Sequence, residues 1–263
     1  MYYYTENAIF PHHLIPEIAK LGIVGADCPT AVGGKGMSCA DTGAMMYELA
    51  CKDASIATFF LLHHSLGNYT VLKLAQPELR KKILDETIPL KKVLAWGLTE
   101  PDNGSDASGL QTTAVKVEGG YLLNGRKKWI GNATFSDYIC IWARNMHEGG
   151  KIQCFLTRQG QKGLVTRKVE RKMALRAVQN AHIEMNNVFV PDNERFELAK
   201  DFASGTKDVL KHSRIFVAWM AAGMAAGACE AAMKYCQQRI QFKKPIAQFQ
   251  LIQAKLVRCV AIT

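Results

Sequence analysis

The sequence has none of the cysteine patterns that staple small domains or hold a metal ion. Its eight cysteines are scattered, no CxxC pair occurs, and no set of cysteines and histidines has zinc-site spacing. This argues against a disulfide framework or a structural metal site, and free thiols in a reducing compartment are the simplest interpretation. The sequence also shows no internal repeat, low-complexity tract or long linker.

The sequence also lacks a clear targeting or membrane segment. The first residues carry no basic stretch followed by an apolar core, so we expect no signal peptide. The longest apolar run, residues 215–229, is too short for a membrane span and is rich in alanine and glycine. We therefore expect a buried helix there. Its Gly223 and Gly227 form a GxxxG pattern, which predicts that two helices of a soluble protein approach closely.

The excess of basic residues is suited to binding nucleic acid, an anionic membrane or a polyanionic small molecule. Lys and Arg number 33 against 23 Asp and Glu, a net charge of +10. The basic clusters are dispersed, and no RNA-binding aromatic motif or zinc finger accompanies them. We therefore expect no nucleic-acid partner, and assign the excess charge to solvated faces and a polyanionic small molecule. The glycine-rich residues 33–36 complete neither phosphate-binding motif, GK[ST] or GxGxxG, so they are predicted to be a loop.

What is present is an ordinary globular composition with a change of pattern along the chain. The 263 residues are 48% hydrophobic and 21% charged, enough for one large or two small domains at roughly 150 residues each. The patterns predict an α+β fold with an N-terminal helical domain (1–92), a middle β domain (93–200) and the start of a C-terminal helical bundle (201–263).

Periodicity predicts the elements of these three zones. Helical spacing of apolar residues predicts one helix over 40–62 and others over 78–86, 209–238 and 249–261. In the middle zone, alternation with glycine turns predicts a hairpin around Gly119, a second turn at Asn124-Gly125, and strands over 138–143, 153–156 and 182–190. These strands predict an antiparallel barrel or sandwich.

Three segments carry residues suited to chemistry. In residues 96–106 a strand runs into a turn with small hydroxyls and Asn-Gly, which can present backbone N–H groups to an anion or a polar ring edge. Residues 127–132 place an indole, Trp129, beside a tight turn. In the third segment Arg239 could clamp a pyrophosphate. Taken singly, each is more simply a hairpin loop, a core residue or a solvated helix end.

Together the three segments resemble the acyl-CoA dehydrogenase/oxidase family of flavoproteins. That family has a T-E-P-x-x-G-S-D loop, a W-I-x-N turn and an R-x-x-F motif followed by a later Gln, and all three occur here in order. The helical, β, helical order is also similar. Within the family the chain looks most like plant short-chain acyl-CoA oxidases and glutaryl-CoA dehydrogenases, notably over residues 98–110, 117–132 and 53–55.

The resemblance implies FAD as cofactor, an acyl-CoA thioester as substrate, and a homodimer or homotetramer. It places the backbone of Leu98 and the hydroxyl of Thr99 at the flavin pyrimidine edge. Ser105 would lie near both the pyrophosphate and the CoA, and Arg214 near the acyl-CoA. The implied cofactor-binding residues are Leu98, Thr99, Gly104, Ser105, Trp129, Ile130, Gly131, Arg239, Phe242 and Gln250, the last three reaching the FAD of a neighbouring subunit.

Three positions depart from the family pattern. Gly131 stands where most members have a hydroxyl that faces flavin N5, and the missing side chain is expected to ease oxygen approach. Lys243 stands where Gly is usual, at a tight bend. No glutamate occupies either family position of the catalytic base: one lies downstream of residue 263, and the other is Ser213 here. Glu100 and Glu230 are not expected to replace it, so the catalytic residue is left unassigned.

These departures leave several explanations open. The chain is expected to be a fragment of a longer enzyme, a shortened protein without catalysis, or a chain completed by another. The leading function is FAD-dependent α,β-dehydrogenation of acyl-CoA thioesters, and the alternative is an inactive flavin-binding subunit or scaffold. The expected compartment is a peroxisome or mitochondrial matrix in a eukaryote and the cytoplasm in a bacterium. Acyl chain length and electron acceptor are not readable from the sequence.

Overall fold

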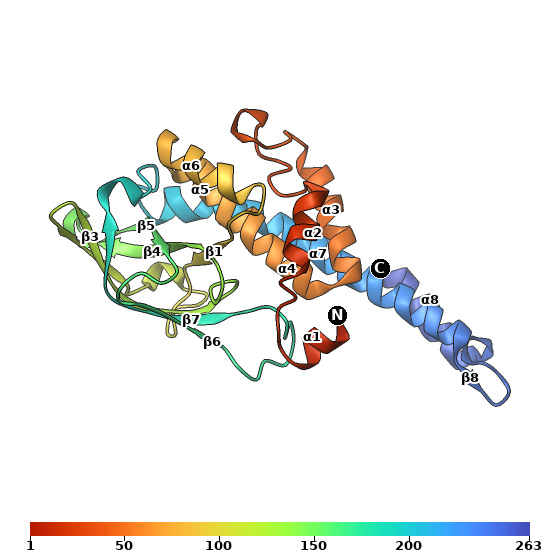
Figure 1. Cartoon of the computed structure of the whole chain (residues 1–263). Helices are drawn as coiled ribbons and strands as arrows, with labels where there is room; N and C mark the ends of the chain where they lie inside the picture. Colours follow the sequence, from red (N-terminus) through yellow and green to blue (C-terminus); the bar gives the residue numbers. More distant parts are fainter.

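The computed structural model describes residues 1–263 and contains a helical part, a curled sheet and a projecting helical arm (Figure 1). The N-terminal helices are α1 (Tyr2–Glu6), α2 (Leu14–Leu21), α3 (Cys39–Lys52), α4 (Ala54–Leu61), α5 (Tyr69–Leu74) and α6 (Pro77–Thr87), with a π-helix, η2 (Leu62–Asn68), between α4 and α5. The helical N-terminal zone is therefore confirmed.

The single helix predicted over 40–62 is wrong, because Asp53 divides it. Asp53 has extended backbone angles, and its carboxylate accepts hydrogen bonds from the backbone N–H groups of Ser55 and Ile56, both at 2.9 Å. It is thus the N-cap of α4, and satisfies two N–H groups that a helix start leaves unpaired. The apolar periodicity continues across the break and hides it.

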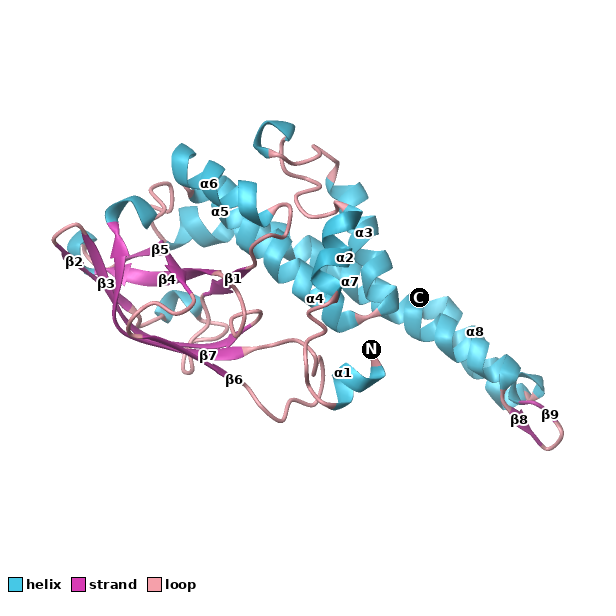
Figure 2. Cartoon of the chain, viewed as in Figure 1, coloured by secondary structure: helices cyan, strands magenta, loops and turns pink.

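The middle zone is one curled sheet (Figure 2). Its strands are β1 (Leu94–Gly97), β2 (Thr113–Val117), β3 (Gly120–Ile130), β4 (Tyr138–Asn145), β5 (Lys151–Arg158), β6 (Leu164–Lys168) and β7 (Ala181–Pro191). They lie in the order β1-β4-β2-β3-β7-β6, and β5 pairs with the other edge of β4.

The sheet is mixed, so the prediction of an antiparallel barrel or sandwich needs correction. β1 and β2 both pair in parallel with β4, at its first and last residues respectively. The chain between β1 and β4 includes the whole β2–β3 hairpin, which is long enough for a parallel crossover. Alternation of apolar residues reports burial and not strand direction, so the sequence could not distinguish the two.

The predicted hairpin at Gly119 is confirmed, and the predicted turn at Asn124-Gly125 is wrong. β3 runs through these residues with a register shift against β7 between Leu123 and Gly125. Gly125 has φ +148°, where an L side chain is strained. The Asn-Gly pair therefore lies within one long strand and does not end it; the extra residue of this bulge belongs to β7, where Asn186 and Asn187 face Asn124.

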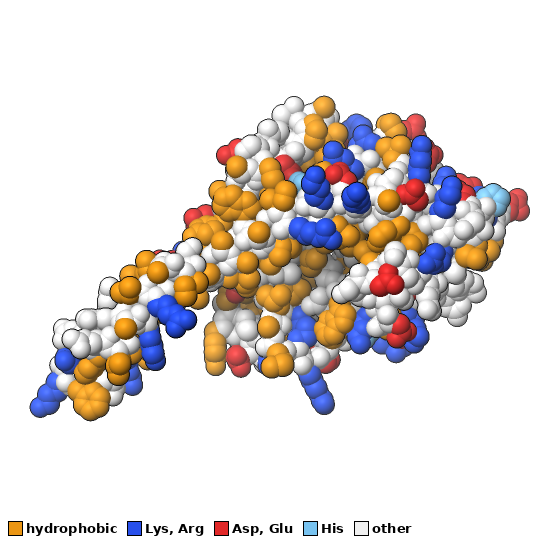
Figure 3. Space-filling model, turned by 180° about the vertical axis from the view of Figure 1, so that it is seen from behind, with side chains coloured by type: hydrophobic (Ala, Val, Ile, Leu, Met, Phe, Trp, Pro, Cys, Tyr) orange, Lys and Arg blue, Asp and Glu red, His pale blue; other side chains and the backbone are white.

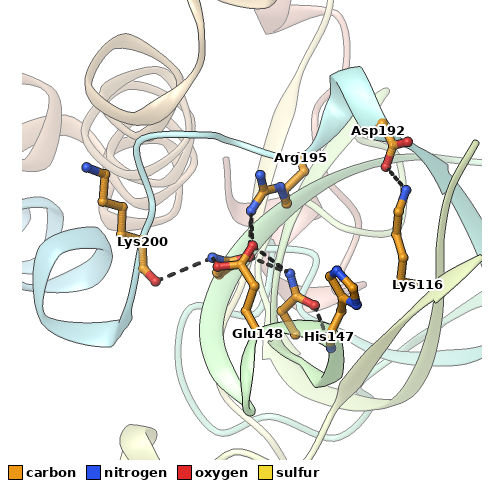
Figure 4. Close-up of polar contacts among 8 residues, drawn as sticks. Lys116, His147, Glu148, Asp192, Arg195 and Lys200 are labelled. Atoms are coloured by element: carbon orange, nitrogen blue, oxygen red, sulfur yellow. Dashed lines mark hydrogen bonds and ion pairs between the residues drawn. The ribbon is translucent and has the colours of Figure 1, made fainter.

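The sheet is tied to the last helical zone by polar contacts (Figure 4). Arg195, in the connection that follows β7, donates to Glu148 at 2.6 Å and to Gln153 at 3.0 Å. Gln153 also donates to the carbonyl of Lys200 at 3.4 Å. These bonds fix the direction in which the chain enters α7 (Phe202–Gln238).

α7 packs along α3 and then leaves the body of the molecule (Figure 1). A Cβ on Gly223 would lie 2.3 Å from the carbonyl oxygen of Tyr47, and one on Gly227 would lie 2.2 Å from that of Cys51. The GxxxG prediction of close helix approach within a folded domain therefore holds, because only glycine lets these backbones meet. By length and composition alone α7 could also cross a membrane. The prediction of a buried helix over 215–229 is wrong, because only the face that packs on α3 is covered, with Phe216, Met220 and Gly223 buried.

Beyond the contact with α3 the chain forms an arm. It consists of the last turns of α7, the short strands β8 (Ile240–Gln241) and β9 (Lys244–Pro245), and α8 (Gln250–Ile262). No residue of α8 is buried. Hydrophobic side chains cover much of this arm, and others border a hollow between the helices and the sheet (Figure 3).

Candidate functional site

The first part of the site is the chain that leaves β1. Leu98 is buried and Thr99 is half-buried. Their two backbone N–H groups and the Thr99 hydroxyl donate no hydrogen bond within the chain. The carbonyl of Thr99, by contrast, accepts from the backbone N–H of Lys128 at 2.9 Å. Buried N–H groups without a partner are rare in folded proteins, so this strand end is suited to a ligand that brings acceptors.

A buried ion pair lies behind this strand end. The Lys127 ammonium donates to Glu100 at 2.9 Å and to the carbonyl of Leu98 at 3.0 Å. Glu100 also accepts from the backbone N–H groups of Gln111 and Thr112, at 2.6 and 2.9 Å. These bonds fasten the loop after β1 to β3, so they fix the direction of the free donors on Leu98 and Thr99.

The pair also has shifted pKa values. Burial lowers the pKa of Lys127 to about 8, against the opposing effect of Glu100. Burial alone would raise the pKa of Glu100, but the charge of Lys127 and the hydrogen bonds from Thr112 and Gln111 lower it. Glu100 is therefore held as a carboxylate with its oxygens occupied. It is an anchor and not a general base, as the sequence indicated.

Trp129 is the second part of the site. Its φ is +64°, a left-handed conformation that a non-glycine residue adopts only when its surroundings hold it there. Its carbonyl accepts from the Asn180 side chain at 3.0 Å, and the Lys128 ammonium lies 5.5 Å from the ring centroid. The indole is 51% exposed. The exposed indole of Trp129 lies beside the unpaired N–H groups of Leu98 and Thr99, so it offers a stacking surface for a planar molecule.

The turn after Trp129 is buried. Ile130 belongs to the apolar cluster inside the sheet, and Asn132 donates to the carbonyl of Phe59 at 3.3 Å. A Cβ on Gly131 would lie 2.2 Å from Cδ1 of Leu62. The space that a side chain at position 131 would take is therefore occupied by Leu62, and easier oxygen approach at Gly131 stays a prediction.

Gly104 and Ser105 lie in the exposed loop between β1 and β2. A Cβ on Gly104 would meet nothing within 4 Å, and Ser105 makes no hydrogen bond. The loop closes on itself through the backbone N–H of Glu100, which donates to the carbonyl of Asn103 at 3.1 Å. Both residues are thus accessible, next to the anchored strand end.

The three remaining motif residues are not brought to this place. Arg239, Phe242 and Gln250 are exposed and lie in the arm, away from the sheet (Figure 1). Phe242 and Lys243 form the β8–β9 turn with φ of +51° and +62°. The sequence expectation of a tight bend at Lys243 is therefore confirmed.

Arg214 is exposed on α7 and makes no ion pair or hydrogen bond. It is the thirteenth residue of a helix that begins at Phe202, seven residues earlier than the start predicted at Val209, so it lies well inside the helix and not in its first turn. Its neighbour Ser213 is buried and donates to the carbonyl of Leu210 at 3.1 Å. No carboxylate occupies that position.

Two histidines and an aspartate hold this part of α7 against the N-terminal domain. Asp27 lies 3.0 Å from Nε2 of His212 and 3.1 Å from Nε2 of His64. His64 accepts the backbone N–H of Gly25 at Nδ1, so Nε2 is the nitrogen that carries a proton toward Asp27. Burial opposes ionisation of Asp27, yet the two imidazoles hold its pKa well below the usual range.

Sequence reasoning missed these supporting groups, namely Lys127, Asn180, Leu62 and the Asp27 cluster. Only Lys127 carried a usable signal, namely its even spacing along one strand from Tyr121 and Leu123, which are buried.

Comparison with known proteins identifies the family. The models of the acyl-CoA dehydrogenase N-terminal, middle and C-terminal domains match residues 1–89, 95–188 and 204–263. The chain belongs to the acyl-CoA dehydrogenase family. Among relatives, benzylmalonyl-CoA dehydrogenase of Aromatoleum aromaticum is 33% identical over 254 residues, covering 95% of this chain and 67% of the relative. Caffeyl-CoA reductase-Etf complex subunit CarC of Acetobacterium woodii is 36% identical, covering 94% and 66%.

Solved acyl-CoA dehydrogenase structures share the fold. A glutaryl-CoA dehydrogenase from Mycobacterium smegmatis in complex with FADH2 has a TM-score of 0.90 at 28% identity, covering 98% of this chain and 66% of that one. Butyryl-CoA dehydrogenase from Megasphaera elsdenii has a TM-score of 0.89 at 31% identity, covering 97% and 68%. The chain thus spans about two thirds of the length of these relatives.

Proposed function

We propose that this chain binds FAD and serves the α,β-dehydrogenation of acyl-CoA thioesters. The observation that carries the proposal is the pair of unpartnered N–H groups on Leu98 and Thr99 beside the exposed indole of Trp129. Relatives of the same family support it: one neighbouring structure contains FADH2 and another contains FAD.

The residues present suit a flavin. Its pyrimidine edge carries acceptors that the Leu98 and Thr99 N–H groups and the Thr99 hydroxyl can satisfy. Trp129 would cover one face of the ring system, backed by Ile130 and Gly131. Gly104 and Ser105 are accessible on the adjoining loop, where a diphosphate and the substrate's CoA could lie. The protein would thereby supply binding and orientation, and the cofactor the redox chemistry.

In the proposed reaction, the substrate loses an α-proton to a base and a hydride from its β-carbon. When bound, FAD would accept that hydride, and the thioester becomes α,β-unsaturated. Arg214, a free cation on α7, would attract the anionic CoA ester. No carboxylate of the described site suits the base: Glu100 is fully bonded, Glu230 pairs with Lys234 on the exposed side of α7, and residue 213 is serine.

We propose further that the arm completes a second site in a homodimer or homotetramer. Arg239, Phe242 and Gln250 have no partner for their exposed side chains in the chain itself. A guanidinium, an aromatic ring and an amide suit the diphosphate and ring edge of a cofactor held by another copy. Binding of cofactor and association would then be coupled.

The test is anaerobic titration of the flavin-loaded chain with acyl-CoA thioesters. Flavin absorbance that persists through gel filtration, lost in Trp129→Leu and kept in Phe189→Leu, supports the cofactor site; Phe189 is an exposed aromatic of β7. Bleaching of that absorbance by substrate supports the reaction. Colour without bleaching indicates the alternative, a flavin-binding scaffold, which the serine at position 213 favours. Peroxide formed on admitting air separates oxidase from dehydrogenase.

A further inference from the structure

Gly131 and Leu62 form a steric pair across two domains. A Cβ on Gly131 would lie 2.2 Å from Cδ1 of Leu62 and 3.7 Å from Nδ2 of Asn180. The nearest obstacle is therefore the end of one flexible side chain. This differs from Gly223, where the obstacle is the backbone oxygen of Tyr47 at 2.3 Å.

Leu62 is held in this place from behind. It is the first residue of the π-helix η2, and it is half-buried. The next two residues fix the backbone: Nδ1 of His63 accepts the N–H of Leu94 at 3.0 Å, and Nδ1 of His64 accepts that of Gly25 at 3.0 Å. Because the π-helix cannot retreat without breaking these bonds, only a change of rotamer or of residue can move Leu62 from Gly131.

The turn that Leu62 faces is fixed as well. Asn180 holds the carbonyl of Trp129 at 3.0 Å, and Asn132 holds the carbonyl of Phe59 at 3.3 Å. The π-helix and the Trp129–Gly131 turn are thus both held in place, and the side chain of Leu62 that lies between them is wholly apolar. Short π-helical segments within helices are frequent at functional sites.

We propose that Leu62 is the residue that limits access of dioxygen to the cofactor beside the Trp129–Gly131 turn. The inference rests on the proposed function, because it requires the flavin to lie against that turn. Residue 131 is glycine and has no side chain, and the side chain of Leu62, from the N-terminal domain, takes the space that one would fill. The size of residue 62, and not the glycine alone, then sets how readily a small oxidant reaches the reduced flavin.

The test measures how fast dioxygen reoxidises the photoreduced flavin in the loaded protein. Dioxygen takes two electrons and two protons from the reduced flavin and leaves as hydrogen peroxide. This needs no substrate and no catalytic base. Leu62→Ala is expected to raise the second-order rate constant by about tenfold. Leu66→Ala, from the same π-helix and packed on the core, should stay within about twofold of the wild type. An equal effect of both variants, or none of Leu62→Ala, overturns the proposal.

A second readout uses thermal melting of the apoprotein. Gly131→Ala should lower the melting temperature in the wild-type background and much less in the Leu62→Ala background, because the added methyl then has room. Additive effects overturn the steric pair. A wild-type chain that binds no flavin overturns the proposed function and the oxygen-access proposal with it, whereas loaded protein with unchanged reoxidation in Leu62→Ala overturns only the latter.

Discussion

The strand-end site and the arm differ in what holds their residues. Leu98, Thr99 and Trp129 are fixed by contacts within the chain, above all the buried pair of Glu100 and Lys127. In the arm α8 buries no residue, and Phe242 and Leu251 are 86% and 81% exposed. One part of the motif set is therefore pre-organised by its own chain, and the other depends on something that packs against it.

The largest expected effect is removal of one member of the buried ion pair. Glu100→Ala leaves the Lys127 ammonium buried with one backbone carbonyl, so the free energy of unfolding should fall by about 3–5 kcal/mol. Urea denaturation measures this. The matched change on α7, Glu230→Ala, removes an exposed partner of Lys234 and Lys52 and should leave stability unchanged. Similar small losses in both variants would contradict the distinction.

The π-helix should make stability depend on pH. Burial lowers the pKa of His63 from its ordinary 6.5 to about 4. Above pH 6.5 the imidazole is neutral in both the folded and the unfolded state. As the pH falls from 6.5 toward 4, protonation favours the unfolded state, and the free energy of unfolding should fall by about 3 kcal/mol. Urea denaturation of the wild type and of His63→Gln at several pH values from 7 to 4 measures this. The loss of about 3 kcal/mol in the free energy of unfolding should occur only in the wild type. Parallel curves would refute it.

The seam between α7 and α3 marks where the body ends and the arm begins. Gly223→Val pushes a side chain against the carbonyl of Tyr47 and should lower the free energy of unfolding by about 1–3 kcal/mol. Ala222→Val, exposed on the same helix, is the control and should change stability little. Equal effects would mean that the two helices do not meet at Gly223.

The smallest effect is expected at the tip of the arm. Lys243 has φ +62°, so Lys243→Gly should stabilise the β8–β9 turn by up to about 1 kcal/mol. Amide exchange in the hairpin measures this local gain. Lys244→Gly, at an extended strand position, should give no gain, and a gain in both would show that the left-handed turn is not the cause.

Sequence motifs could locate the site but not its supports. Thr99 and Trp129 belong to short motifs, so their neighbourhood could be predicted from the order of residues alone. The pairing of Glu100 with Lys127 joins residues 27 positions apart, and the Asn-Gly pair between them resembles a turn in sequence. Similarly, the occupation of the space at Gly131 by Leu62 joins residues 69 positions apart along the chain, and no local pattern reports such a contact.

The fold could be predicted to the level of zones, and less well in detail. Periodicity found the long helix and most strands, because burial repeats at 3.6 or 2 residues. It missed the break at Asp53, which depends on one capping carboxylate, and it could not give the parallel pairings of β4. The oligomeric state, the compartment and the assignment of Arg239, Phe242 and Gln250 to a neighbouring copy stay predictions.

The most direct test of the central claim follows the amide protons of Leu98 and Thr99. The account predicts that adding FAD shifts these two amide resonances and slows their exchange with solvent, because each gains an acceptor. The amide of Lys128, already bonded to the Thr99 carbonyl, should keep its protection throughout. Flavin that binds while the Leu98 and Thr99 amides exchange as before would contradict the account.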